Sequence, residues 1–441
     1  MSAAPEMALA SLDGRARAVV PVLRPERLRA WDALRGGGGA TVPRGAGLSY
    51  AGLSFGGGAV SVSHARFDRL MDYDAGTGEL TVEAGATLWA VQRFLVAQGR
   101  FLPCHPGHGR ITVGGCVAVD AHGKNPARDG TFRRQVAGLE LFHPDHGTRA
   151  LEAGGEGADL LDLTCGAFGL TGHVLSVRLR SRPIPGAAAT VTRRAFADTA
   201  EGLAALAAAS AGEGFAYTWH DLSRAEGPAP GFVFEVGFEA GEGAPELGTP
   251  PGTPARGGAP VGLVRRASLP ALNAAFRRRT ARLAGGRRLP LGEALFPFHG
   301  GELYFRLFGR PGFRQHQLLV PAEAAAEVFE AARARAARRG AAIALASCKR
   351  FGGAASLLRF EGEGVAMALD VPRGTGADAL AEDLDALVIE AGGRANLAKD
   401  SRLPRAVVEA TCPGVDDFRA RRAAADPGRR MRSALSERLG L

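Results

Sequence analysis

The C-terminal half of the chain repeats one strand–helix–strand pattern, and this repeat narrows the possible folds more than any other feature. The pattern occurs at 317–349 and again at 367–399. In each copy an apolar strand ends in Val-Pro and is followed by a helix, and glycine ends that helix before a second strand begins. Two such units predict a ferredoxin-like βαββαβ sheet. Lys349 and Lys399 then occupy equivalent ends of the two units, so we expect both on one side of one sheet.

Shorter apolar segments predict small α/β units in the first 184 residues. The expected elements are a helix at 88–98 and strands at 40–43, 59–62, 79–84, 136–142 and 174–180. Segment 107–125 is dense in glycine and small residues and has few helix signals, so we do not expect a helix there. Pro183 and Pro185 mark a boundary.

Beyond this boundary the sequence predicts helices at 199–210 and 267–282 and a strand at 232–238. Residues 241–260 are rich in glycine and proline and have few hydrophobic side chains. Such a segment buries too little apolar surface to stay ordered alone, so we expect a mobile loop.

The chain has 54 basic and 45 acidic residues, a formal net charge of +9. The arginines are spread along the sequence and are seldom interleaved with aromatic residues, so we expect no nucleic-acid partner. Five scattered cysteines lack metal-ligand spacing, which indicates free thiols, no metal site and a reducing, cytoplasmic location. No run approaches 18 apolar residues, so no transmembrane segment is expected.

Lysine is scarce, because Lys124, Lys349 and Lys399 are the only lysines among the 54 basic residues. Lysine is a compact charge whose pKa shifts readily, whereas the bulky fork of arginine stays protonated. Each lysine is therefore present either by chance or because arginine cannot replace it. The count alone leaves both alternatives open.

Two glycine-rich segments are candidates for ligand binding. Loop 44–52 has three glycines, which let backbone N–H groups approach an anion, although an ordinary tight turn remains the alternative. Segment 106–125 has a Gly-Gly pair that suits a backbone laid against a flat or charged ligand. His122 alone would more often be structural, but Gly-Lys-Asn follows it in a chain poor in lysine and asparagine.

Four segments together resemble a known family. They are PRGAGLSYAG (43–52), HPGHGRITVGGCVAVDAHGKN (105–125), GAFGLTG (166–172) and GGRANLAKDSR (392–402). In this order they are similar to the FAD-linked oxidases of the vanillyl-alcohol oxidase type, and within that family to the decaprenylphosphoryl-ribose oxidases. The similarity runs from residue 43 to the C-terminus and is vague over 186–300.

The resemblance implies an α+β fold. The FAD-binding domain is bipartite: segments 1–184 and 393–441 together form it, and it has two α+β subdomains. Between these segments, residues 185–392 form an inserted substrate domain with an antiparallel sheet and helices. The implied FAD-binding residues are Arg44, Gly45, Ala46, Gly47, Leu48, Ser49, Tyr50, Gly107, Thr112, Gly114, Gly115, Val119, His122, Gly123, Lys124, Asn125, Gly172, Val174 and Asn396. The implied substrate residues are Gln315, Gln317, Lys349 and Lys399.

The sequence departs from the family pattern at three positions of the implied site, namely Leu48, Ala368 and Asn396. Members with covalent flavin have a histidine where Leu48 stands, so we expect non-covalent FAD. The ribose oxidases have a cysteine in place of Ala368 and a tyrosine in place of Asn396. The substrate is therefore expected to be either a polyprenyl-phosphate sugar or a soluble sugar. The first, a glycolipid, would bring peripheral membrane contact and a reductase partner that completes an epimerisation.

The implied activity is FAD-dependent oxidation of a primary or secondary alcohol to a carbonyl by hydride transfer. A buried lysine with a lowered pKa can take the hydroxyl proton, so Lys399 is the candidate base and His122 the second candidate. Gln315 and Gln317 alternate on one strand face and would hydrogen-bond a polyol, while Lys349 would meet a phosphate or a second hydroxyl. The alternatives are a catalytically degenerate FAD-binding subunit or scaffold and, more remotely, a basic nucleic-acid binder.

Overall fold

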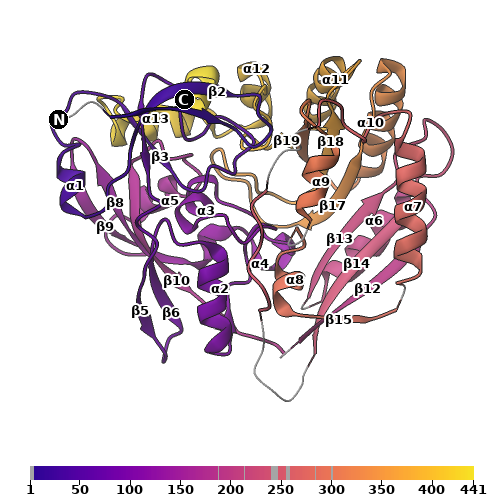
Figure 1. Ribbon diagram of the computed structural model, residues 1–441, viewed down its shortest axis with the longest axis horizontal. Helices are drawn as coiled ribbons and strands as arrows, with labels where there is room; N and C mark the ends of the chain where they lie inside the picture. Colours follow the sequence, from indigo (N-terminus) through magenta and orange to yellow (C-terminus); the bar gives the residue numbers. More distant parts are fainter. Residues whose placement is uncertain are drawn as a thin grey trace.

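The computed structural model describes residues 4–186, 188–212, 214–239, 247–254, 259–283, 285–298 and 301–441. In Figure 1 the N-terminal sheets form the left half, and the right half holds two antiparallel sheets covered by helices. Half of the expected mobile loop at 241–260 lies outside the described residues. Of its described part, Leu247 and Pro251 are buried, unlike the side chains of a freely exposed loop.

The N-terminal part contains two main sheets. The first has strand order β1-β2-β4-β3, with β2, β4 and β3 parallel, and the second is antiparallel with order β5-β6-β10-β8-β9. The strands are β1 (Glu6–Ala10), β2 (Arg17–Leu23), β3 (Thr41–Arg44), β4 (Val60–Ser63), β5 (Leu70–Asp74), β6 (Glu79–Glu83), β8 (Val136–His143), β9 (Gly147–Glu152) and β10 (His173–Arg180). The five strands predicted in this region are confirmed within one or two residues.

Short helices and one small ribbon connect these sheets. They are α1 (Arg29–Asp32), α2 (Leu88–Ala97), α3 (Val113–Val119), α4 (Pro126–Asp129), the 3₁₀ turn η1 (Phe132–Gln135), α5 (Ala158–Thr164) and the pair β7 (Arg100–Phe101) and β11 (Arg182–Pro183). The prediction that segment 107–125 contains no helix is wrong, because α3 lies within it. The Thr112 hydroxyl caps α3 by accepting from Gly115 N–H at 3.2 Å, a signal that the glycine content obscured.

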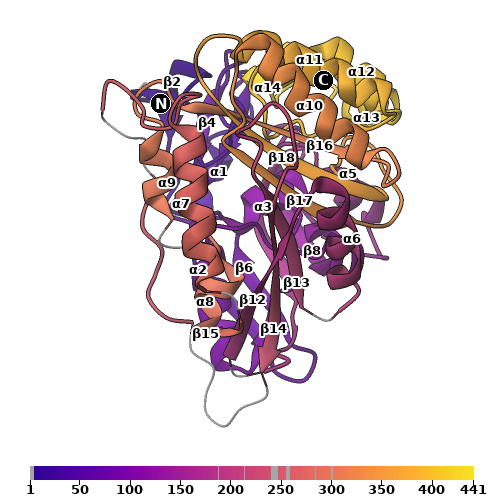
Figure 2. The ribbon, with the colours of Figure 1, turned by 90° about the vertical axis from the view of Figure 1, so that its right-hand side faces the viewer.

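The middle region forms a four-stranded antiparallel sheet in the order β13-β14-β12-β15. Its elements are β12 (Ala188–Phe196), α6 (Thr199–Ser210), β13 (Phe215–His220), β14 (Gly231–Glu239), α7 (Leu269–Ala281), β15 (Arg287–Leu289), α8 (Leu291–Leu295) and α9 (Glu302–Leu307). The predicted helices and strand of this region are confirmed. In Figure 2 helices α7, α8 and α9 lie along one margin of the molecule.

The C-terminal repeat forms the predicted ferredoxin-like sheet, with antiparallel order β17-β18-β16-β19. Its elements are β16 (Phe313–Val320), α10 (Ala325–Arg339), β17 (Leu345–Phe351), β18 (Gly364–Pro372), α11 (Ala377–Glu390) and β19 (Arg394–Ala395). The strand expected at 396–399 is a turn instead, in which Lys399 N–H donates to Asn396 O at 3.1 Å. Edge strand β17 joins this sheet to β13 through Cys348 N–H, which donates to Thr218 Oγ1 at 3.1 Å.

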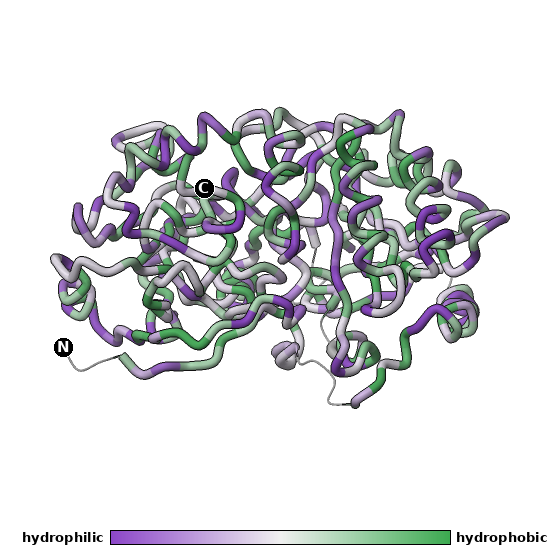
Figure 3. The backbone as a smooth tube through the Cα atoms, turned by 90° about the horizontal axis from the view of Figure 1, so that it is seen from above, coloured by the Kyte–Doolittle hydropathy of each residue, from purple (hydrophilic) through white to green (hydrophobic). Residues whose placement is uncertain are grey.

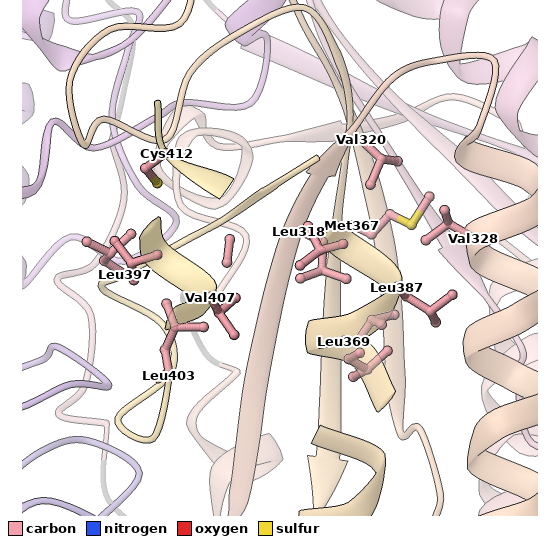
Figure 4. Packing of buried hydrophobic residues seen from close by; sticks show 14 of the residues in the cluster. Leu318, Val320, Val328, Met367, Leu369, Leu387, Leu397, Leu403, Val407 and Cys412 are labelled. Atoms are coloured by element: carbon pink, nitrogen blue, oxygen red, sulfur yellow. The ribbon is translucent and has the colours of Figure 1, made fainter. Parts of the chain in front are cut away.

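Strand alternation separates an apolar face from a polar face in this sheet. Leu318 and Val320 of β16 and Met367 and Leu369 of β18 pack against α10 and α11 (Figure 4). The alternate residues, among them Gln317, point to the opposite face. In Figure 3 short hydrophobic and hydrophilic segments follow one another along the backbone tube.

The last helices return to the N-terminal sheets. They are α12 (Arg405–Thr411), α13 (Val415–Ala425) and α14 (Ala434–Leu439). The buried Asp426 carboxylate, after α13, lies 3.2 Å from the Nε2 atom of His143 in β8. Arg430 pairs with Asp145, and Met431 bridges to Thr41 of β3. These contacts tie the end of the chain to its beginning.

Candidate functional site

A continuous cavity of about 640 Å³ lies between the N-terminal sheets and the polar face of the ferredoxin-like sheet. Its size is in the range of small-molecule and cofactor sites. The residues singled out from the sequence that line it are Gly45, Ala46, Gly47, Leu48, Ser49, Tyr50, Gly107, Thr112, Gly114, Gly115, Val119, His122, Lys124, Gly172, Val174, Gln315, Gln317, Lys349, Asn396 and Lys399.

Three of the singled-out residues do not line the cavity. The Asn125 amide donates to the carbonyls of Ser210, Gly212 and Gly214 and so anchors the end of α6. The Arg44 guanidinium donates to Ser54 Oγ at 2.8 Å. Gly123 contributes only its carbonyl oxygen, which accepts hydrogen bonds from two cavity side chains described below.

Loop 45–50 offers a row of free backbone donors at one end of the cavity. The backbone N–H groups of residues 45–50 donate no hydrogen bond to any other described residue. A Cβ at Gly45 would overlap Thr112 Oγ1, so only glycine fits where the loop meets the start of α3. Free N–H groups that converge in a turn are suited to an anion such as a phosphate.

Helix α3 lies unusually close to strand β6. Gly114 N–H donates to Ala84 O at 2.7 Å, and a Cβ at Gly114 would be 2.8 Å from the Ala84 Cβ. The Gly-Gly pair therefore serves this close backbone packing. Its neighbour Ala118 lines the cavity beside Val119. A flat ligand can lie against this small-residue surface.

A directional hydrogen-bond chain crosses the floor of the cavity. Ala398 N–H donates to Asn396 Oδ1 at 3.0 Å, which leaves the Asn396 amide nitrogen to donate to Gln317 Oε1 at 2.7 Å. Gln317 Nε2 in turn lies 2.9 Å from His122 Nε2. His122 Nδ1 lies 3.0 Å from the carbonyl oxygen of Gly123. Because backbone groups fix both ends, every donor and acceptor in the chain is determined.

This chain specifies a neutral His122. Its Nε2 atom must accept from Gln317, so the proton is on Nδ1 and is donated to Gly123 O. Burial, together with the charges of Lys349 and Lys399, lowers the pKa of His122 to about 3. A histidine whose accepting nitrogen is already occupied is a poor general base.

Lys399 is the cation left free to act on a ligand. Its Nζ lies 4.7 Å from the centroid of the Tyr50 ring and donates no hydrogen bond to another described residue. Burial lowers its pKa to about 8, although the Asp370 carboxylate opposes that shift. Lys349 has a pKa near 8 for the same reason, but its Nζ donates to Gly123 O at 3.1 Å.

Lys124 is buried more deeply than the other two lysines. Its Nζ donates to the carbonyl oxygen of Leu295 at the end of α8, and lies 5.3 Å from the centroid of the Phe215 ring. Burial lowers its pKa well below the usual range. Lys124 therefore joins the N-terminal part to α8 at the cavity wall.

The sequence reasoning missed a buried carboxylate at this site. Asp370 accepts from Tyr304 OH at 2.5 Å and from Gln315 Nε2 at 2.7 Å. Burial raises its pKa to about 6. Asp370 is paired with Gln315 across the β16–β18 ladder, as Ala368 is with Gln317. The two-residue alternation that placed Gln315 and Gln317 on one strand face also places Asp370 and Ala368 on the same face of β18, and this signal could have identified Asp370.

Six further aromatic side chains line the cavity and are here called the aromatic wall; sequence reasoning identified none of them as site residues. The wall consists of Tyr217, Trp219, Phe234, Phe276, Phe298 and Tyr304. The rings of Trp219 and Phe276 meet edge to face with their centroids 4.7 Å apart, and the rings of Tyr217 and Phe234 stack with their centroids 5.0 Å apart. The cavity thus combines a polar strand face with a set of aromatic rings.

The described residues contain no cluster of three or more metal-ligating side chains. All five cysteines are buried and free, as predicted. Over the same described ranges, no helix is long and apolar enough to cross a membrane.

Comparisons with known proteins agree with the geometry of the cavity. Residues 18–149 match the FAD binding domain family. An uncharacterized protein of Streptomyces coelicolor is 32% identical over 373 residues, 80% of this chain and all of that protein. Decaprenylphosphoryl-beta-D-ribose oxidase of Mycolicibacterium smegmatis is 29% identical, over 92% of this chain and 90% of the oxidase.

A shorter similarity links the chain to enzymes of hydroxy acids. D-lactate dehydrogenase of Anaerostipes hadrus is 30% identical over 143 residues, 32% of this chain and 30% of the dehydrogenase. The FAD-binding domain, the similarity to the ribose oxidase over most of both chains and the glycine-lined cavity indicate the same class of protein. The chain therefore belongs to the FAD-dependent oxidoreductases of the vanillyl-alcohol oxidase type, enzymes that act on alcohol groups.

Proposed function

We propose that this enzyme oxidises a primary or secondary alcohol of a sugar or sugar-like substrate to a carbonyl. The observation that carries the proposal is one cavity with two chemically different ends. One end has the free N–H groups of loop 45–50, and the other has the polar face of β16–β18. FAD, when bound, supplies a two-electron acceptor; the protein supplies binding, orientation and proton transfer.

The proposed FAD site uses the glycine-lined end of the cavity. Loop 45–50 would hold the pyrophosphate on its N–H groups, and α3 would support the rest of the cofactor. The proposed FAD domain comprises 1–184 and 393–441, with 185–392 inserted as the substrate domain. Leu48 has no nucleophilic atom, so we propose that FAD is held without a covalent bond.

Lys399 is the proposed base for the substrate hydroxyl. With a pKa near 8 it is partly neutral at physiological pH and can accept the hydroxyl proton. His122 is less suited because its Nε2 lone pair already accepts from Gln317. The Asp370 carboxylate near Lys399 would then stabilise the ammonium that forms.

The substrate end fits a polyol. Asp370 fixes the Gln315 amide nitrogen, so the carbonyl oxygen of Gln315 is free to accept from a hydroxyl. The aromatic wall would cover the apolar face of a sugar ring. Lys349 suits a phosphate or a further hydroxyl, which keeps both a polyprenyl-phosphate sugar and a soluble sugar open. The first option retains a reductase partner and membrane contact.

An anaerobic substrate screen tests the proposal. The purified protein is mixed with sugars, sugar phosphates and D-2-hydroxy acids while the flavin absorption band is followed. Bleaching by a sugar or sugar phosphate, but not by hydroxy acids, is the expected result. Bleaching by hydroxy acids alone would replace the sugar assignment. A flavin band that no alcohol bleaches would support a degenerate FAD-binding subunit instead.

A further inference from the structure

Most of the net positive charge of the chain comes from one stretch of the sequence. Residues 259–310, here called the arginine face, contain ten arginines and two glutamates, a formal charge of +8 against +9 for the entire chain. Nine of these arginines are exposed. Acidic residues are scarce within this segment, although two from outside it form ion pairs with its arginines: Asp221 pairs with Arg277 at 3.2 Å and Glu239 with Arg288 at 3.8 Å.

Exposed apolar side chains gather on the same surface. Of thirteen large hydrophobic residues that are exposed among the described residues, seven belong to the arginine face. They are Val261, Leu263, Leu272, Phe276, Leu283, Phe298 and Leu303. Exposed apolar groups in this number and density mark an interaction surface.

The segments of the arginine face form one continuous surface. Leu263 N–H donates to Leu307 O at 2.7 Å, and Arg310 N–H donates to Ala259 O at 2.8 Å. Leu269 of α7 packs in the same cluster as Phe305 and Phe308, which joins α7 to α9. Figure 2 shows α7, α8 and α9 along the same margin.

The arginine face reaches the cavity. Phe276 and Phe298 are exposed to solvent and also line the cavity. Anything bound to the arginine face therefore lies beside the entrance to the substrate end.

We propose that the arginine face binds the surface of an anionic lipid bilayer. Clustered arginines are attracted to acidic headgroups, and exposed aliphatic side chains enter the headgroup–acyl boundary. A nucleic acid fits less well, because five of the seven apolar residues are aliphatic and cannot stack on bases. A second copy of the chain fits less well too, because two such faces would repel each other.

Vesicle sedimentation tests the proposal independently of catalysis. The full-length protein is mixed with vesicles of phosphatidylcholine alone or of phosphatidylcholine with phosphatidylglycerol, and the bound fraction is measured. Binding is expected only to the anionic vesicles. It should fall sharply in about 1 M NaCl, where the Debye length is about 3 Å.

Matched variants locate the binding surface. Leu263→Ser with Leu303→Ser removes two side chains that are 66% and 65% exposed, and should weaken binding about tenfold. Val19→Ser with Leu28→Ser changes similarly exposed residues (66% and 60%), one in β2 and one just before α1, both outside the arginine face, and should have no effect. All four positions are exposed, so an unchanged flavin absorption band confirms that each variant is folded.

A second pair of variants tests the charge. Arg278→Glu, Arg279→Glu and Arg282→Glu together should weaken binding to anionic vesicles about a hundredfold. The control changes exposed Arg24, Arg27 and Arg29 to Glu in the same way and should bind normally. Equal binding to neutral vesicles, or equal losses in variant and control, would overturn the proposal. So would binding to a DNA duplex that exceeds vesicle binding.

Discussion

Replacing Asn396 by aspartate should reverse the hydrogen-bond chain on the cavity floor. The Asn396 amide nitrogen now donates to Gln317 Oε1. A carboxylate in its place can only accept, so the Gln317 amide must turn over to donate to it. Gln317 Oε1 then faces His122 Nε2, and that nitrogen must carry the ring proton. The His122 tautomer therefore changes, although the substitution is two hydrogen bonds away.

The size of the effect on stability follows from the two ends of the hydrogen-bond chain. Once Nε2 carries the proton, the bare Nδ1 atom faces the Gly123 carbonyl oxygen, and two acceptors are left in contact. An unsatisfied buried acceptor costs about 1–3 kcal/mol, so the free energy of unfolding should fall by that amount. Protonating Nδ1 relieves the contact, and at about 1.4 kcal/mol per unit the pKa of His122 should rise by about 1–2 units. Starting near 3, His122 stays neutral at pH 7.

Nitrogen-15 NMR of histidine-labelled protein measures the tautomer directly. In the wild type the Nδ1 atom of His122 should have the shift of a protonated ring nitrogen and Nε2 that of a bare one. The two shifts should exchange in Asn396→Asp. Loss of the signals in His122→Gln assigns them.

Asn273→Asp is the matched control. Asn273 is also buried and donates to a side chain, the Asp221 carboxylate, at 2.7 Å, but has no contact with the cavity chain. It should be destabilised without any change at His122. Identical His122 shifts in the wild type and Asn396→Asp would refute the directional chain.

Three further predictions concern the cofactor, the buried carboxylate and the glycine loop. Acid precipitation should release FAD into the supernatant, because Leu48 cannot form a covalent link; flavin that stays with the precipitate would contradict this. The folded pKa of Asp370 is raised from 3.8 to about 6, so its stabilising contribution is largest below pH 4 and falls by about 3 kcal/mol as pH rises through 6. Denaturant unfolding of the wild type and Asp370→Asn across this range should show that difference, and a pH-independent difference would exclude it. Gly45→Ala should lower FAD affinity in a fluorescence titration and destabilise the protein by about 1–3 kcal/mol, whereas Gly39→Ala should do neither.

Sequence periodicity predicted the elements that bury one apolar face. The two strand–helix–strand units were predicted from their Val-Pro ends and helix-stopping glycines, and the sheet order follows from that repeat. Helix α3 was not predicted, because its stability depends on close packing of Gly114 against Ala84, which local propensity does not reveal. The prediction of a strand at 396–399 is wrong because the Asn396 side chain accepts a hydrogen bond from Ala398 N–H, which turns the backbone at this point.

Most of the cavity lining was predictable from the resemblance, and two of the lysines also from the scarcity of their residue type. Scarce lysines and the resemblance indicated Lys349 and Lys399, and both line the cavity. Asn125 was chosen for the same scarcity, but its amide anchors three carbonyl groups. Asp370 was missed because one aspartate among 45 acidic residues has no distinctive sequence signal; its importance comes from burial beside Tyr304 and Gln315.

Stopped-flow reduction of FAD in Lys399 variants tests the central claim most directly. Lys399→Ala should keep its FAD absorption band but lower the rate of reduction by substrate about a hundredfold to ten-thousandfold. Lys399→Arg should not restore the rate, because a permanently protonated guanidinium cannot accept the hydroxyl proton. The wild-type rate should rise with pH through about 8, as neutral Lys399 becomes available. An arginine variant that reduces at the wild-type rate would contradict the assignment and return the role of base to His122.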